Sequence, residues 1–133
     1  MALLGFMRRF EPMIVSGRKR HTIRKHRPDI QPGKRLDLYV DPRQHTMRLI
    51  FRTPCIRKEE ILIDRFGLKR GFGRVIIKVS DVELSDSEMN RLAWHDGFEH
   101  IEDFMLFWRD DYPFDGEIIH WDYEKRREQK APV

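Results

Sequence analysis

The order of the hydrophobic patterns along the chain is the feature that most limits its fold. Up to residue 80, short runs of alternating polar and apolar residues are separated by turn residues such as the pair Pro32-Gly33. From Ser85 onward, apolar residues recur at helical spacing until a last strand pattern at 117–123. Neighbouring strands with short turns, followed by two helices and one strand, predict an α+β domain with a small antiparallel β-barrel or curved sheet and flanking helices.

Capping and turn residues predict where these elements begin and end. Pro12 and Gly17 bracket a short helical turn, because proline suits a first helical position and glycine a left-handed exit. Ser85 and Glu88 have the spacing of a capping box, which predicts a helix that ends near Gly97. A second helix is predicted by the core-facing stripe of Ile101, Phe104, Met105 and Trp108. Further strands are expected at 3–7, 21–24, 34–40, 45–56 and 74–79.

Several stretches have less regular patterns. We expect Pro54 to end the strand that precedes it, since proline cannot donate to a central ladder. Residues 59–63 fit a strand and a helix equally well, and residues 112–116 read as a turn. The segment 55–72 mixes acidic and basic residues. We expect it to form a loop that changes the shape of a binding cleft.

Length and composition indicate a single folded domain over residues 1–133, with a core at about 3–123 and a charged tail at 124–133 that frays. The chain has 133 residues and 40% hydrophobic content, enough for a core without disulfides or metal. Cys55 is the only cysteine, so an intramolecular disulfide is excluded and a cytoplasmic location is expected. The apolar start at 1–7 is too short for a membrane span.

Charge is distributed unevenly along the chain. Residues 1–80 hold 20 Lys and Arg against 7 Asp and Glu, a net +13, whereas residues 81–133 hold 6 against 15, a net −9. The basic residues lie on predicted strands, so a rigid sheet would present them as an array suited to a polyanion such as RNA. Alternatively, the two halves neutralise each other across the fold.

The stretch 17–24 is where chemistry is most plausible. Lys19 lies between Arg18 and Arg20, with Arg24 close by, and crowding of like charges would lower its pKa toward the range of a base or nucleophile. Such a cluster could also anchor a phosphate. The alternative interpretation is a solvated basic strand edge.

The six histidines give no metal-binding motif, because none forms an H-x-x-x-H pair. His95 and His100 lie on either side of Asp96 and could share an ion with it, but surface histidines fit the pattern more simply. We therefore expect neither a metal nor another cofactor.

The motifs together resemble those of the ASCH domain of the PUA-like superfamily. The resemblance rests on Gly17-x-Lys19-x-x-Thr22-x-Arg24, on Pro32-Gly33-Lys34, on Gly73-Arg74-Val75, and on Leu92-Ala93-x-x-Asp96-Gly97-Phe98 before an amphipathic helix. It covers residues 3–123 and implies a PUA-like β-barrel with a cleft between barrel and helices. Members of the superfamily are associated with RNA binding. Some ASCH proteins resemble amidohydrolases that deacetylate N4-acetylcytidine, and others are proposed to cleave RNA.

The resemblance also implies roles for individual residues. Lys19 matches the lysine of the family's cleft, Thr22 its hydroxyl partner and Arg24 the strand arginine. Asp96 matches the acidic residue at the helix junction, where the amidohydrolase members carry glutamate. Aspartate is shorter by one methylene, or about 1.5 Å of reach.

Three functions follow as alternatives. In an amidohydrolase, Lys19, Thr22 and Asp96 are catalytic and act on a modified nucleoside. In a metal-independent ribonuclease, the same cations stabilise a phosphorane, and Asp96 or His21 moves the proton of the 2′-hydroxyl. In a non-catalytic module, the cations hold RNA phosphates while an aromatic ring stacks on a base. The expected substrate-binding or RNA-binding residues are Arg18, Arg20, His21, Arg24 and Trp94, with Tyr39 and Phe98 as further stacking candidates. The oligomeric state is left open.

Overall fold

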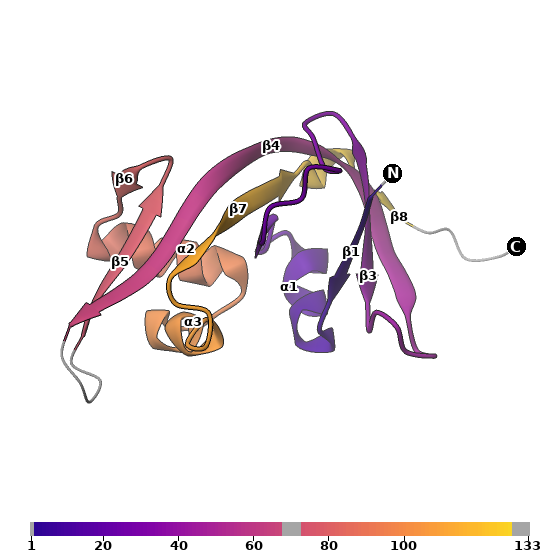
Figure 1. Cartoon of the computed structure of the whole chain (residues 1–133). Helices are drawn as coiled ribbons and strands as arrows, with labels where there is room; N and C mark the ends of the chain where they lie inside the picture. The colour runs from indigo at the N-terminus through magenta and orange to yellow at the C-terminus, as the bar shows by residue number, and fades with distance from the viewer. Residues whose placement is uncertain (1, 68–72, 129–133) are drawn as a thin grey trace, which may run out of the picture.

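The structure is a computed structural model that describes residues 2–67 and 73–128 (Figure 1). Its strands are β1 (Ala2–Phe6), β2 (His21–Arg24), β3 (Arg35–Val40), β4 (Arg48–Gly67), β5 (Gly73–Val79), β6 (Val82–Glu83), β7 (Phe114–Trp121) and β8 (Arg127–Glu128). Its helices are α1 (Glu11–Ser16), α2 (Asp86–Asp96) and α3 (Ile101–Phe107), with 3-10 helices η1 (Arg8–Phe10) and η2 (Tyr123–Lys125). The α+β class and most of the expected elements are confirmed, with ends shifted by a few residues.

The strands form a mixed sheet that does not close into a barrel. Its main path runs β1-β3-β4-β5-β6, while β7 pairs with both β4 and β2, and β8 pairs with β4. The expectation of an antiparallel barrel is therefore wrong in two respects. β1 pairs with β3 in parallel, and in the described part of the chain the path ends at β1 and β6, which do not meet. Short turns predict that strands next to each other in the sequence pair in the sheet. Closure of a barrel depends instead on pairing between strands that are far apart in the sequence.

The longest strand, β4, has 20 residues, arches across the molecule (Figure 1) and pairs with β3, β5, β7 and β8. Its first part pairs with β3 and its second part with β7 and β5. Pro54 lies inside β4, so the prediction that it ends the strand is wrong. Pro54 is tolerated because it sits where the partner changes from β3 to β7, next to a bulge at Cys55–Arg57. The segment 55–67 belongs to this strand and is not a loop, while 68–72 lies outside the described residues.

The helices lie on the concave side of the arch (Figure 1). The capping box that opens α2 is confirmed, because the Ser85 side chain accepts from Glu88 N and the Glu88 carboxylate accepts from Ser85 N. In α3, Phe104 is fully buried and Trp108, at its C-terminal end, is 7% exposed, as the stripe predicted. No helix within residues 2–67 and 73–128 is both long and apolar enough to cross a bilayer.

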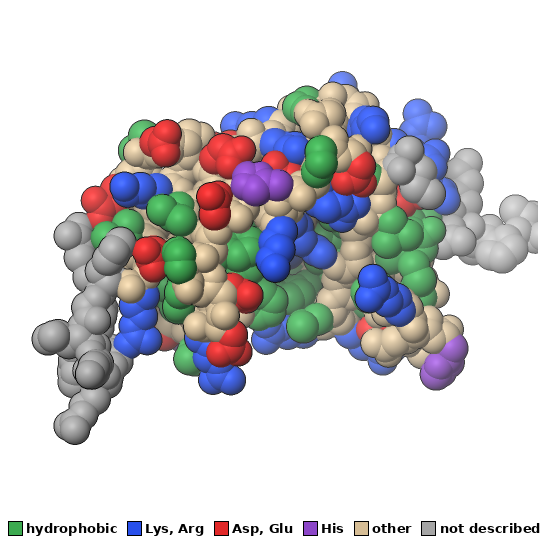
Figure 2. Space-filling model, viewed as in Figure 1, with side chains coloured by type: hydrophobic (Ala, Val, Ile, Leu, Met, Phe, Trp, Pro, Cys, Tyr) green, Lys and Arg blue, Asp and Glu red, His purple; other side chains and the backbone are tan. Residues whose placement is uncertain are grey.

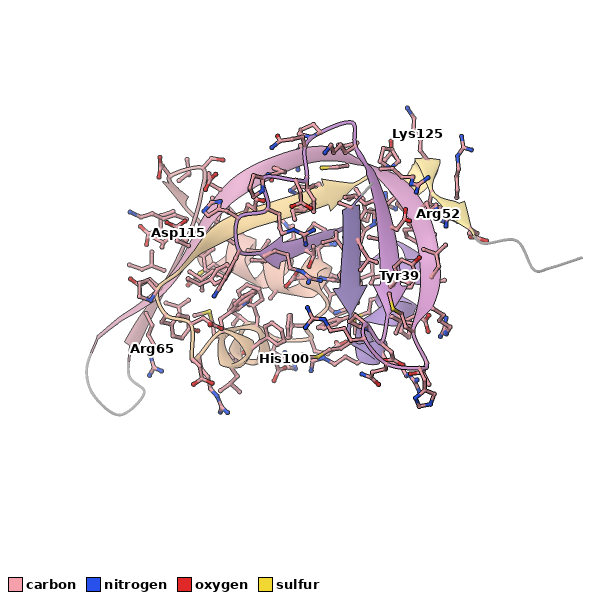
Figure 3. All side chains as sticks on the ribbon, turned by 45° about the vertical axis from the view of Figure 1, so that its right-hand side comes forward. Tyr39, Arg52, Arg65, His100, Asp115 and Lys125 are labelled. Atoms are coloured by element: carbon pink, nitrogen blue, oxygen red, sulfur yellow. The ribbon has the colours of Figure 1, made fainter. Side chains whose placement is uncertain are left out.

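The two ends of the last strand differ from the prediction. The expected turn at 112–116 ends earlier, since β7 already begins at Phe114. The expected fraying tail is partly ordered: after η2, β8 pairs with β4 through Arg127 and Arg52, while 129–133 lie outside the described residues. Lys125 and Arg52 mark this end of the sheet in Figure 3.

Candidate active-site cleft

The exit from α1 directs Lys19 into the molecule. Gly17 ends α1 with φ 85°, a left-handed conformation that glycine adopts readily. The chain then folds back, and the Lys19 backbone N–H donates to Met13 O at 2.9 Å. Lys19 thus precedes β2 and does not belong to it, so strand alternation does not separate its side chain from that of Thr22.

The junction after α2 brings the acidic residue to the same place. Asp96 is the last residue of α2, and Gly97 follows with φ 108°. A Cβ at Gly97 would lie 2.7 Å from the Phe10 ring, so only glycine allows this helix end to approach η1. The close approach places Asp96, 77 positions along the chain, beside Lys19.

Lys19 and Asp96 form a buried ion pair. Lys19 Nζ lies 2.8 Å from Asp96 Oδ1 and 2.7 Å from the Asp96 backbone oxygen, and the two side chains are 3% and 5% exposed. The ammonium therefore also neutralises the partial negative charge at the C-terminus of α2. An ammonium has three N–H donors, so these two bonds leave one donor for a ligand.

Burial changes the pKa of both members of the pair. The pKa of Lys19 is lowered because burial disfavours the ammonium more than the Asp96 charge and hydrogen bond favour it. Among the neighbouring arginines, Arg24 adds to this lowering, whereas Arg18 and Arg20 do not. Crowding by like charges, which the sequence suggested as the main cause of the lowered pKa of Lys19, is therefore secondary to burial. Burial alone would raise the pKa of Asp96, but Lys19 and His21 outweigh it and hold that pKa below its usual value.

Arg24 fixes the hydroxyl of Thr22. Both residues lie on β2, two positions apart and therefore on one face, as predicted. Arg24 Nε donates to Thr22 Oγ1 at 3.1 Å, and its Nη2 donates to Gly5 O at 2.6 Å on β1. Because Oγ1 accepts from Arg24, the hydroxyl proton of Thr22 is available to donate to another group.

These four side chains line one cleft of about 290 Å³. Its walls come from β1, η1, β2, the end of α2, and the segment from α3 to β7. The aromatic lining consists of Phe6, Phe10, Phe98, Phe107, Trp108 and Phe114. On the face shown in Figure 2, basic side chains lie beside a recessed hydrophobic surface. The cleft therefore combines an apolar box with a small polar cluster, the usual composition of a small-molecule site.

Four of the predicted binding residues lie outside this lining, and three of them, Arg18, Arg20 and Trp94, have their side chains at the surface. The Arg18 guanidinium stacks on the Trp94 ring at 3.4 Å and bonds to Glu99, so both side chains occupy the surface of α2. Arg20 covers the Tyr123 ring at 4.7 Å. Trp94 therefore lies on the exposed face of α2. It is 43% exposed, so it belongs neither to the core nor to the wall of the cleft.

His21 lies behind the ion pair. Its Nε2 is 3.4 Å from Asp96 Oδ1, and the side chain is 8% exposed. Its ring packs edge-on against His120 on β7, whose Nε2 in turn lies 2.7 Å from Glu59. His21 thus lies beside Asp96 on the side of the sheet and is not part of the lining of the cleft.

The sequence did not identify the aromatic walls. The helical stripe assigned Trp108 to packing, and nothing marked Phe6, Phe10, Phe107 or Phe114 as cleft residues. Of the stacking candidates, Phe98 lines the cleft, whereas Tyr39 lies on β3 (Figure 3) and does not. Aromatic residues are common core residues, so their type alone did not distinguish them.

No protein-family model, curated protein or solved structure matches the chain. The class that the structure itself defines is an α+β protein with an open mixed sheet and one aromatic cleft containing a buried Lys–Asp pair.

Proposed function

We propose that this protein hydrolyses the amide bond of an N-acylated nucleoside of the N4-acetylcytidine type in the aromatic cleft. The observation that carries the proposal is the buried Lys19–Asp96 pair beside Thr22 and Arg24 in the cleft wall. A buried amine with a lowered pKa can act as a base, and a hydroxyl and a cation can stabilise an oxyanion, so together they can hydrolyse an amide without a metal. The ASCH resemblance suggests the same residues.

The size and lining of the cleft support a single nucleoside as the substrate. A volume of about 290 Å³ lies at the lower end of the range of about 300–1,000 Å³ for ligand sites. The six aromatic residues of the lining offer rings against which a base can pack, either stacked on a face or edge to face. A ribonuclease would instead need a track along several phosphates, so the small size and aromatic lining of the cleft favour a mononucleoside over an RNA strand.

In the proposed reaction Lys19 is the base. The ion-paired ammonium is the resting form, and its lowered pKa makes the neutral amine accessible. The neutral amine takes a proton from a water molecule as the water oxygen bonds to the acyl carbon. The Thr22 hydroxyl donates a hydrogen bond to the acyl oxygen, and the Arg24 guanidinium beside it stabilises the developing negative charge.

The second half of the reaction breaks the amide bond. The Lys19 ammonium, held by Asp96, returns its proton to the leaving nitrogen as the carbon–nitrogen bond breaks. This yields the free amine and acetic acid, which then loses its proton to bulk water. Asp96 thereby orients Lys19 and stabilises its charged form. A carboxylate one methylene longer is not needed for this contact, because Asp96 already reaches Lys19 at 2.8 Å.

The test is turnover of N4-acetylcytidine, followed as cytidine release by chromatography. Lys19→Arg keeps a positive partner for Asp96 but cannot act as a base, since arginine stays protonated. We expect this variant to lose at least about 100-fold in turnover, within the range of general-base catalysis. Lys125→Arg is the matched control, because Lys125 is exposed on η2 and should leave turnover unchanged.

Thr22→Val provides an independent test that leaves the ion pair intact. It removes a hydroxyl and keeps the β-branched shape, so folding, checked by circular dichroism, should be preserved while turnover falls. Wild-type turnover matched by Lys19→Arg would contradict the proposal.

A non-catalytic nucleoside-binding module is the second candidate. The observation that favours it is the closed Lys19–Asp96 pair, in which the amine is held by two acceptors at 2.7 and 2.8 Å. This function would give saturable binding of the nucleoside, measured by calorimetry, without any product.

A further inference from the structure

A second cluster of chemically active side chains lies outside the cleft. It consists of His26, which follows β2, Glu60 on β4 and Asp115 at the start of β7 (Asp115 is labelled in Figure 3). One ligand atom from each lies within 4.8 Å of the other two, and it is the only such group in residues 2–67 and 73–128. None of the three residues lines the aromatic cleft.

The distances in this cluster suit a shared metal ion. His26 Nε2 lies 3.4 Å from Asp115 Oδ1 and 3.6 Å from Glu60 Oε2. Two ligands that bind one ion tetrahedrally at about 2.1 Å are about 3.4 Å apart. An ion could therefore be held with small side-chain adjustments, because all three side chains are at least 49% exposed.

A buried carboxylate lies beside the histidine. Glu117 on β7 is 5% exposed in its side chain, and its Oε1 is held by Lys58 Nζ at 3.0 Å and by the Arg27 backbone N–H at 2.8 Å. Its Oε2 lies 3.6 Å from His26 Nδ1. Metal-binding histidines usually have a carboxylate or carbonyl at the nitrogen opposite the ion, which sets the tautomer and the ring orientation. Glu117 lies where such a partner would be needed, and a small rotation of the exposed His26 ring would bring the two within hydrogen-bond distance.

We propose that His26, Glu60 and Asp115 form a binding site for a divalent transition-metal ion such as Zn²⁺, with Glu117 orienting the histidine. One imidazole and two carboxylates suit Zn²⁺ and Mn²⁺ better than Mg²⁺, which prefers oxygen ligands and water. Three protein ligands leave a further coordination position open. The ion would tie the segment after β2 to the paired strands β4 and β7.

This site differs from the metal interpretation considered for the sequence. His95 and His100 are not brought together with Asp96 around an ion, since His95 Nδ1 lies 3.1 Å from Arg18 O and Asp96 is bound by Lys19. His26 was not singled out, because its partners lie 34 and 89 positions away in the chain.

The test uses untagged protein stripped of metal with a chelator. Zn²⁺ binding is followed by calorimetry, and Co²⁺ absorbance reports the coordination geometry. We expect one equivalent of Zn²⁺ to bind and the unfolding temperature to rise with Zn²⁺. His26→Ala should weaken binding more than Glu117→Gln, for which a loss of about 10–100-fold is expected.

Matched variants separate the site from casual surface binding. His100→Ala removes another exposed histidine and should leave the Zn²⁺ affinity unchanged. Asp115→Asn keeps the shape of the side chain, so it tests the charge where His26→Ala tests the ring. Absence of Zn²⁺ binding in the wild type, or equal affinity in wild type and His26→Ala, would overturn the proposal. The cleft is not involved, so turnover of N4-acetylcytidine does not bear on this result.

Discussion

The buried pair of Lys19 and Asp96 makes a quantitative prediction about stability. At 2.8 Å and an effective dielectric constant of about 20, the two charges attract by about 6 kcal/mol. Lys19→Met removes the ammonium but retains most of the apolar stem, so Asp96 is left buried without its main partner. Breaking such a pair from one side costs about 3–5 kcal/mol. That loss is a large fraction of the about 5–15 kcal/mol that stabilises a typical domain.

A double-mutant cycle measures the interaction itself. The free energy of unfolding is determined by urea denaturation at about pH 7 for the wild type, Lys19→Met, Asp96→Asn and the double variant. We expect the double variant to be more stable than the sum of the single losses predicts, with a coupling energy of at least about 2 kcal/mol. The coupling should persist in about 0.5 M NaCl, since salt screens buried pairs weakly.

An exposed pair provides the control. Arg20 and Glu124 lie 3.4 Å apart with side chains 51% and 75% exposed, and a cycle on this pair should give a coupling close to zero in salt. Additive losses for Lys19→Met and Asp96→Asn would refute the reasoning, because they would mean that the two buried charges do not stabilise each other.

Two further predictions concern other parts of the fold. Gly97→Ala should lower the free energy of unfolding by more than about 1 kcal/mol, because φ is 108° and the added Cβ would lie 2.7 Å from Phe10; thermal unfolding measures it, and an unchanged midpoint would contradict it. His120 has its pKa lowered to about 4 from 6.5, mainly by burial and also by His21. As the pH is lowered, His120 therefore takes up a proton at a higher pH in the unfolded chain than in the folded one. The free energy of unfolding should fall by about 3 kcal/mol as pH drops from 6.5 to 4. Urea denaturation across this range should show less of this loss in His120→Gln, and an equal loss would exclude His120 as the source.

Local signals in the chain predicted much of the fold. Ser85 and Glu88 sit within one helical turn, so their spacing identified the start of α2 directly. Gly17 likewise marked the end of α1. Pro54 misled the prediction, because the effect of a proline in a strand depends on which neighbour would have received its missing hydrogen bond. That neighbour is set by the switch of β4 from β3 to β7.

The candidate site was predictable in part. Lys19, Thr22, Arg24 and Asp96 were named from their motif, and they line one cleft. Arg18, Arg20 and Trp94 were grouped with them by closeness in sequence alone. In the fold, neighbouring residues point in different directions: Arg18 stacks on Trp94 at the surface, and Arg20 covers Tyr123.

The sequence by itself determined the order of most helices and strands, the capping box of α2, and which residue types were present to do chemistry, because these depend on interactions within a few positions. Only the tertiary structure decided that the sheet stays open and that six aromatic residues from separate segments enclose one cleft. It also decided that the Lys19 side chain is buried and forms an ion pair with a carboxylate 77 positions away. Burial and distance arise when β1, β2 and α2 pack together, and no pattern local to one of these elements contains that information.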